Sequence, residues 1–314
     1  MSFFKKKPNP APRDEDVIIL KQTRPNECGG TDATQRRSAP KEIVSTEMTR
    51  FSATSALPWK INAGPDENTL GYVSAYAAPA AGGSFLYLVT ADAYRRRDEK
   101  NSGWAFVKAD VFPALVKLVN ETGLAQKNGY HSTTHGLPEN FGGSVDIRYA
   151  SGEQIDFSDN QTPILTTDTA MKIAALFTDA MKGEKIPLPD TTTLTEIRFA
   201  EEREGDGFTH ATLTLAADGT ATNKKTSRYT DPTVYESEKP VDAETVAKIK
   251  KTIADCAMLA WTDLPDYDFR IGGVKTLTFV FADGTEITVG GNKVLPGSLG
   301  GGFFTIELEM TTKH

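Results

Sequence analysis

The chain has 314 residues, of which 39% are hydrophobic and 25% are charged, and its two cysteines are too few for a disulfide framework. This length predicts two domains, each large enough to bury a hydrophobic core without a metal ion. No run of 18 apolar residues occurs, so we expect no helix that spans a membrane.

The net charge of −7 is unevenly distributed along the chain. Residues 1–41 carry a net charge of +4, which leaves −11 on the remainder. An acidic body repels phosphate backbones, so we expect no nucleic-acid partner. Met1–Lys5 are not followed by the apolar segment of a secretory signal, and we therefore expect a cytoplasmic location.

Residues 1–41 are rich in Pro, Lys, Arg, Asn and Asp and contain a single apolar tetrad, Val17–Leu20. Such a composition buries too little apolar surface to offset the entropy lost on ordering, so it predicts a mostly disordered tail. The tetrad has the composition of a short strand that could dock on the folded body.

Two segments share a pattern, one at 142–157 and the other at 272–289. Each begins with a Gly-Gly pair and alternates apolar and polar residues up to a turn, at Ser151-Gly152 in the first and at Asp283-Gly284 in the second. After the turn the alternation resumes. Because this alternation is typical of strands and glycine accepts positive φ, both segments are predicted to be β-hairpins.

An amphipathic helix is predicted before each of these hairpins. The first helix covers 111–122, with Asp110 as its N-cap, and the second begins at Asp242 with apolar residues at 246, 249 and 253 on one face. A further helix is predicted at 168–181. The segment 303–311 alternates more like a strand, and we leave open whether it is a helix or a strand.

Further strands are predicted ahead of each helix. In the first half, 71–78 pairs with 84–94, and an opening strand lies within 43–57. In the second half, 195–202 pairs with 208–216, and Asp218-Gly219-Thr220 opens another strand.

These elements predict an α+β fold with two tandem β-β-α-β-β repeats, each an antiparallel sheet with a helix packed on one face. We place a mostly disordered tail at 1–41, the first repeat at 42–182, a linker at 183–193 and the second repeat at 194–314.

Three further motifs carry a family resemblance. They are Trp261-Thr262-Asp263-Leu264-Pro265 after the second helix, Phe279–Thr285 in the hairpin, and Asn292 followed by Pro296. Together they resemble a loose group of uncharacterised bacterial proteins that carry one or two copies of a small α+β domain. The resemblance covers roughly residues 42–312 and implies an architecture, without implying an activity.

One pair of histidines is a candidate metal site. His131 and His135 lie four residues apart, a spacing that on a helix would place both imidazoles on one face, where they could bind zinc. The flanking Gly129 and Gly136 and the Ser/Thr run between the histidines instead predict a polar loop. A metal-dependent hydrolase that uses this loop is therefore the alternative function.

The remaining candidates favour structural roles. Gly297–Gly302 lacks the Lys-Ser/Thr pair of a phosphate loop and is predicted to be a flexible turn. Asp263, Asp266 and Asp268 lack the spacing of a calcium loop and are predicted to lie in a solvated loop above Trp261. Cys256 is predicted to be a small core residue. We thus predict no catalytic residue, no cofactor and no metal ligand.

The function predicted from these patterns is a non-enzymatic binding or protein-interaction module, whose unidentified partner is expected to be a protein. An antiparallel sheet covered on one face leaves its other face available for binding. We expect the partner at such an open face, together with the loops at 125–141 and 258–271. The oligomeric state, and whether both repeats bind, are left open.

Overall fold

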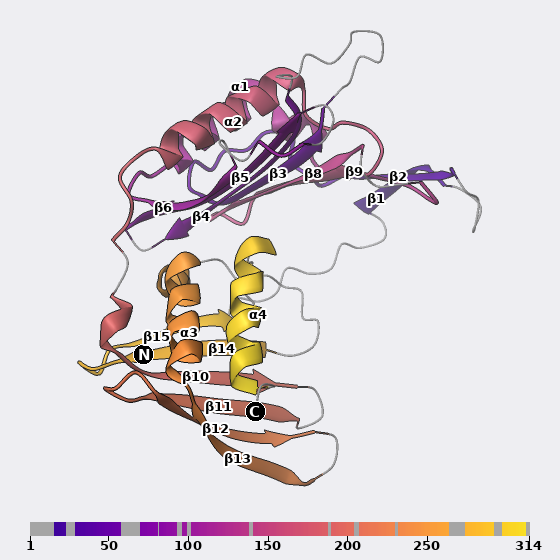
Figure 1. Cartoon of the computed structure of the whole chain (residues 1–314). Coiled ribbons are helices and arrows are strands. Elements are labelled where there is room, and N and C mark those ends of the chain that lie inside the picture. Colours follow the sequence, from indigo (N-terminus) through magenta and orange to yellow (C-terminus); the bar gives the residue numbers. More distant parts are fainter. Residues whose placement is uncertain are drawn as a thin grey trace. The chain divides into compact units, whose positions relative to one another are not determined.

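The fold is known from a computed structural model, shown in Figure 1. The structure describes residues 16–22, 29–57, 70–80, 82–92, 96–98, 102–137, 141–187, 190–203, 207–229, 232–263, 274–291 and 297–311. The chain folds into two compact units. The first comprises Met1–Ala77, Leu86–Ala105 and Ala109–Gly183, and the second comprises Ala78–Phe85, Phe106–Lys108 and Glu184–His314.

A nine-stranded sheet forms the first unit, except that the ends of three of its strands are grouped with the second unit. The strand order is β1-β2-β7-β9-β8-β3-β4-β5-β6. β7 and β9 run parallel, which makes the sheet mixed. The strands are β1 (Val17–Lys21), β2 (Thr31–Arg36), β3 (Met48–Ala56), β4 (Leu70–Ala80), β5 (Gly83–Asp92), β6 (Gly103–Val107), β7 (Tyr130–Thr134), β8 (Gly143–Tyr149) and β9 (Gln154–Asp159).

A six-stranded antiparallel sheet forms the second unit, with the order β13-β12-β11-β10-β14-β15. Long pairings join its neighbours and are regular except for one shift between Leu194 and Glu196 on β10, so the register is well defined. The strands are β10 (Leu194–Glu202), β11 (Phe208–Leu215), β12 (Ala221–Arg228), β13 (Val234–Val241), β14 (Val274–Phe281) and β15 (Glu286–Gly291).

Two helices cover one face of each sheet (Figure 1). The helices are α1 (Phe112–Thr122) and α2 (Thr167–Met181) on the nine-stranded sheet, α3 (Ala243–Asp255) and α4 (Gly297–Thr311) on the six-stranded sheet, and the short 3-10 helices η2 (Leu124–Lys127), η3 (Thr191–Thr193) and η4 (Met258–Asp263). Asp242 caps α3, because its carboxylate accepts the Thr245 N–H at 2.7 Å, as predicted. The N-cap of α1 is Val111 rather than Asp110, although the Asp110 carboxylate accepts the Phe112 N–H at 3.0 Å.

Each core lies between a sheet and its helices. Strands such as β3, β8 and β10 alternate, so that one face is apolar and buried while the other is polar. Under α1 and α2, Phe51 on β3 packs against Phe177 on α2, with ring centroids 5.9 Å apart. Under α3 and α4, Phe199 and Phe279 are buried in the same way. No helix within the described residues combines the length and the apolar composition that a membrane span requires.

The prediction of two β-β-α-β-β repeats is wrong. Among the described residues the fold is mostly β, with 47% in strands and 26% in helices. Four strands rather than two precede α3 in the six-stranded sheet, and six strands, β1 to β6, precede α1 in the nine-stranded sheet. The strand β13 was missed because seven of its eight residues are exposed, so it shows no alternation of apolar and polar residues.

The predicted tail and the predicted glycine turn also need correction. Part of the tail is ordered, because β1 and β2 join the nine-stranded sheet. The Gly297–Gly302 segment begins helix α4 instead of forming a turn, and 303–311 continues that helix. The buried residues Phe303, Ile306 and Met310 follow a helical spacing, which the alternating Glu307 and Glu309 obscure in the sequence.

Candidate functional site

The open face of the nine-stranded sheet carries a row of polar side chains opposite the helix-covered face. Their neighbours in the chain, such as Ile147 and Phe157, are fully buried on the helix side. Residues paired across neighbouring strands share a face, and Asp146 pairs with Asp156 while Arg148 pairs with Gln154. We define the polar row by its members, which are Arg50, His131, Asp146, Arg148, Gln154, Asp156 and Ser158.

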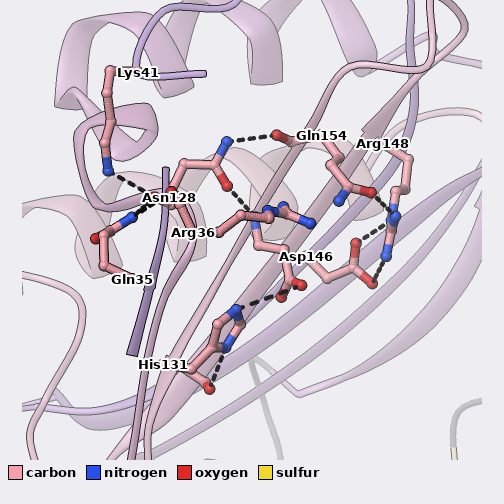
Figure 2. A network of polar contacts seen from close by, with 10 residues as sticks. Gln35, Arg36, Lys41, Asn128, His131, Asp146, Arg148 and Gln154 are labelled. Carbon is pink, nitrogen blue, oxygen red and sulfur yellow. Dashed lines mark hydrogen bonds and ion pairs between the residues drawn. The ribbon is translucent and has the colours of Figure 1, made fainter. Parts of the chain in front are cut away.

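One part of the polar row is a chain of ion pairs and hydrogen bonds across β3, β8 and β9. A guanidinium nitrogen of Arg50 lies 3.3 Å from the Asp146 carboxylate, and Arg148 Nε donates to the same carboxylate at 2.6 Å. Arg148 also donates to Gln154 Oε1 (Figure 2). The Arg50 guanidinium in addition lies 5.8 Å from the ring centroid of Tyr76, and burial raises the pKa of the Tyr76 hydroxyl to about 12.

The other part of the polar row surrounds the imidazole of His131. Its Nδ1 lies 3.1 Å from Ser158 Oγ, and its Nε2 lies 3.8 Å from Asp156 Oδ2 (Figure 2). An activated serine needs a base whose ring is oriented by a hydrogen-bonded third group. The 3.8 Å separation exceeds hydrogen-bond length, so Asp156 does not orient the ring in that way. The three side chains form a polar surface contact.

The predicted loop around the two histidines is instead strand β7 and the residues that continue it. His135 lies in the turn directly after β7, where its N–H donates to Gly30 O at 2.9 Å and its Nε2 binds the Asp32 carboxylate at 2.8 Å. The strand segment from His131 to Thr134 alone spans roughly 10 Å, whereas zinc holds each ligand at about 2 Å. His131 and His135 therefore cannot bind the same ion. Among the described residues, no group of three His, Cys, Asp or Glu side chains could hold a metal ion.

Asn128 was not singled out in the sequence. Its side chain holds the backbone of β9, the strand that carries part of the polar row. Asn128 is fully buried, and its Nδ2 donates to Pro40 O at 2.9 Å and to Gln154 O at 2.7 Å. Its Oδ1 accepts the Asp156 N–H at 2.8 Å (Figure 2). The side chain thus ties β9 to the turn that leads into β7. The Asn-Gly dipeptide at 128–129 is a turn signal that could have drawn attention to it.

The segment before β3 is held to the same residue. The backbone oxygen of Asn128 accepts hydrogen bonds from Gln35 Nε2 at 2.9 Å and from Lys41 Nζ at 2.7 Å. Gly129 follows with a φ of +79°, and a Cβ at this position would lie 2.5 Å from Ala39 Cβ. This close approach requires glycine. The tail residues that were predicted to be disordered therefore support the polar row.

The other candidates from the sequence lie elsewhere. Trp261 is fully buried, as expected, and its Nε1 donates to Cys256 O at 3.1 Å. Cys256 follows α3 and is partly exposed, and burial raises the pKa of its thiol. Asp263 ends η4, and the predicted loop residues Asp266 and Asp268 lie outside the described residues.

No protein-family model matches the chain, and a search of the curated proteins finds no match. A function for the chain has to be inferred from the geometry of the polar row and its surroundings.

Proposed function

We propose that the chain is a non-enzymatic protein-interaction module, and that the polar row is the surface that contacts its partner protein. The observation that supports this proposal is the row itself. Charges of alternating sign, on Arg50, Asp146 and Arg148, lie across adjacent strands of one sheet face and are held in place by mutual contacts.

The energetics of the contacts favour a binding role over a stabilising one. The Arg50 and Asp146 side chains are only 12% and 21% exposed, so the cost of desolvating both charges offsets much of their attraction, and the pair contributes little net stability to folding. The same contacts restrict their side chains before a partner arrives, which lowers the entropy lost on binding. Fixed charges of both signs also discriminate between partners, because a like charge placed opposite either of them is unfavourable.

The chemistry of the row defines the partner's surface. Asp156 favours a lysine or arginine from the partner. Arg148 favours a carboxylate, which would accept hydrogen bonds from the N–H groups that Arg148 does not use for Asp146 and Gln154. Strand backbones hold these groups at fixed separations, so the partner must present its charges with a matching spacing. The partner is proposed to be a protein of the cytoplasm, the location expected from the sequence.

A charge-reversal experiment tests the proposal. The wild-type chain, Arg148→Glu and Asp156→Lys are immobilised, and the proteins retained from host lysate are quantified. Arg198→Glu is the matched control, because Arg198 lies on the other sheet, is 47% exposed compared with 42% for Arg148, and binds Glu196 and Glu286 in a similar way.

The proposal expects a protein that the wild type and Arg198→Glu retain equally, and that Arg148→Glu and Asp156→Lys each retain at least tenfold less. A compensating charge reversal on that protein should restore binding to the variant chain. Equal retention by all four chains, or no specific protein retained by the wild type, would contradict the proposal.

A further inference from the structure

Strand β1 presents an apolar edge to solvent. In the strand order it pairs with β2 alone. Val17, Ile19 and Leu20 are 37%, 61% and 55% exposed. Among the elements whose side chains are described, no other has three large apolar residues exposed to this extent. An edge strand of this kind is a template on which another strand can pair.

The edge of the other sheet shows how an unused edge is protected. One of the two outermost strands there is β13, which pairs with β12 alone. β13 contains Glu236, Glu238, Lys239 and Pro240. Charged residues and proline discourage the addition of another strand. β1 contains four consecutive apolar residues and, at its end, one charge. The contrast indicates that the β1 edge is covered in the working protein.

We infer that the β1 edge is covered by the β1 strand of a second copy of this chain, in an antiparallel, two-fold symmetric pair. The charges at its ends support this occupant. Asp16 precedes the strand and Lys21 ends it. In an antiparallel pair, Asp16 of each copy lies toward Lys21 of the other. The Asp16 carboxylate also accepts hydrogen bonds from the N–H and hydroxyl of Ser38, so charges of opposite sign lie near each other at both ends, with the apolar residues between them.

The length of the strand limits the strength of the dimer. A register shift between Ile19 and Lys21 places a bulge at Leu20 and restricts the regular ladder to three residues. One such strand buries less than the roughly 1,600 Å² of a standard interface. The dimer therefore forms with a dissociation constant in the micromolar range or weaker, and it dissociates on dilution.

Sedimentation velocity of the full chain from 1 to 500 μM tests this inference. The wild type is expected to shift from monomer to dimer across that range. Ile19→Lys places a lysine of each copy among the apolar residues of the pair and is expected to weaken the dimer at least tenfold. Val44→Lys is the matched control, because Val44 is apolar and 86% exposed but lies outside β1, and it should dimerise as the wild type does.

Amide hydrogen exchange locates the interface and confirms that each variant is folded. Exchange of the amides of β1 should slow as the wild-type concentration rises, while exchange in β13 stays constant. A monomer at every concentration overturns the inference, and so does a dimer that Ile19→Lys forms as readily as the wild type. Arg148→Glu should dimerise normally, so failure of the proposed function and failure of this inference are distinguishable.

Discussion

The two sheets share an order of six strands. They differ in what lies beyond one end of that order, which we call the margin. The order β9-β8-β3-β4-β5-β6 in the first matches β15-β14-β10-β11-β12-β13 in the second, element by element. In the first sheet the margin continues beyond β9 with β7, β2 and β1. In the second sheet β15 is the last strand in the order, and η4 lies against it. The same arrangement of strands thus supports two different margins.

The difference coincides with the two surfaces that we propose for binding. His131 belongs to β7, one of the added strands, and the polar row continues from β3, β8 and β9 onto it. The exposed apolar edge of β1 is also part of the addition. Both proposed binding surfaces therefore depend on strands that the six-stranded sheet lacks. The following experiments test how independent and how similar the two sheets are.

The largest effect is expected from Gly143→Ala at the β3–β8 pairing. A Cβ on Gly143 would lie 2.0 Å from Thr54 O and 2.7 Å from Ser55 Cα. These are backbone atoms that cannot move aside, so the pairing at the centre of the nine-stranded sheet must open, at a cost of about 3 kcal/mol or more. Amide exchange should accelerate in β3 and β8 while it stays unchanged in the six-stranded sheet.

Gly103→Ala on β6 is the control for Gly143→Ala. An added Cβ there meets no described atom within 4 Å, and the backbone of Gly103 is not left-handed. The stability of this variant should stay within about 0.5 kcal/mol of the wild type. Unchanged amide exchange in β3 after Gly143→Ala would contradict this prediction and would show that the β3–β8 pairing accommodates the added Cβ.

The next effect compares a buried asparagine in each sheet. Asn128→Ala leaves the carbonyls of Pro40 and Gln154 without their donor and the Asp156 N–H without its acceptor, so we expect a loss of about 3 kcal/mol. Asn223 donates to Met310 O at 2.8 Å, and its Oδ1 finds no hydrogen-bond partner among the described residues. Asn223→Ala should therefore cost about 1 kcal/mol. Urea denaturation measures the loss of stability in each variant, and amide exchange assigns that loss to one sheet. Equal losses in the two variants would contradict the prediction.

The sequence predicted the elements whose signals are local. The hairpins at 143–159 and 274–291 were found because strand alternation and a turn glycine lie within about 16 residues of each other. Helix α3 was found because Asp242 caps it and its apolar face follows a helical period. Such signals do not depend on what the rest of the chain does.

Strands β2 and β7 were missed because they depend on distant partners. β2 is largely polar, and it pairs with β7, about 100 residues away along the chain. His131 was recognised as a candidate, but its neighbours Asp156 and Ser158 meet it only through the parallel pairing of β7 with β9. Hydrophobic periodicity carries no information about such pairings.

A smaller effect follows from the residue before each matching turn. Tyr149 precedes the first turn and Phe281 the second, and each donates its N–H four residues along the chain, at 3.1 and 2.9 Å. Burial raises the pKa of the Tyr149 hydroxyl to about 12, with a smaller contribution from the charge of Glu153. The unfolded chain ionises first, above pH 10, so the nine-stranded sheet loses stability between pH 10 and 12.

Tyr149→Phe should reduce this loss of stability at alkaline pH by an amount on the order of 1 kcal/mol at pH 11. The two turns should then have the same pH dependence. Urea denaturation at pH 8 and pH 11 measures the difference. Phe281→Tyr is the reciprocal variant, and it should make the six-stranded sheet sensitive to alkali. An identical pH dependence in the wild type and in Tyr149→Phe would contradict the assignment.

The smallest effect is expected at the N-caps of two helices. Thr166 caps α2 with a hydroxyl that accepts the Thr169 N–H at 3.2 Å, whereas Asp242 caps α3 with a carboxylate. The hydrogen bond from the Thr245 N–H lowers the pKa of Asp242 below its usual value. As the pH falls below about 4, the unfolded chain takes up this proton before the folded chain does, so the contribution of the cap to stability is lost.

Exchanging the caps should exchange this acid sensitivity between the sheets. Asp242→Thr should remove it from α3, and Thr166→Asp should introduce it at α2, as measured by amide exchange in the two helices between pH 5 and 2.5. Both caps are exposed to solvent, so added salt should weaken the carboxylate's interaction with the helix dipole while leaving the hydroxyl cap unaffected. An acid response of α3 that persists in Asp242→Thr would place its origin in a different group, and the two helices would then differ by more than their caps.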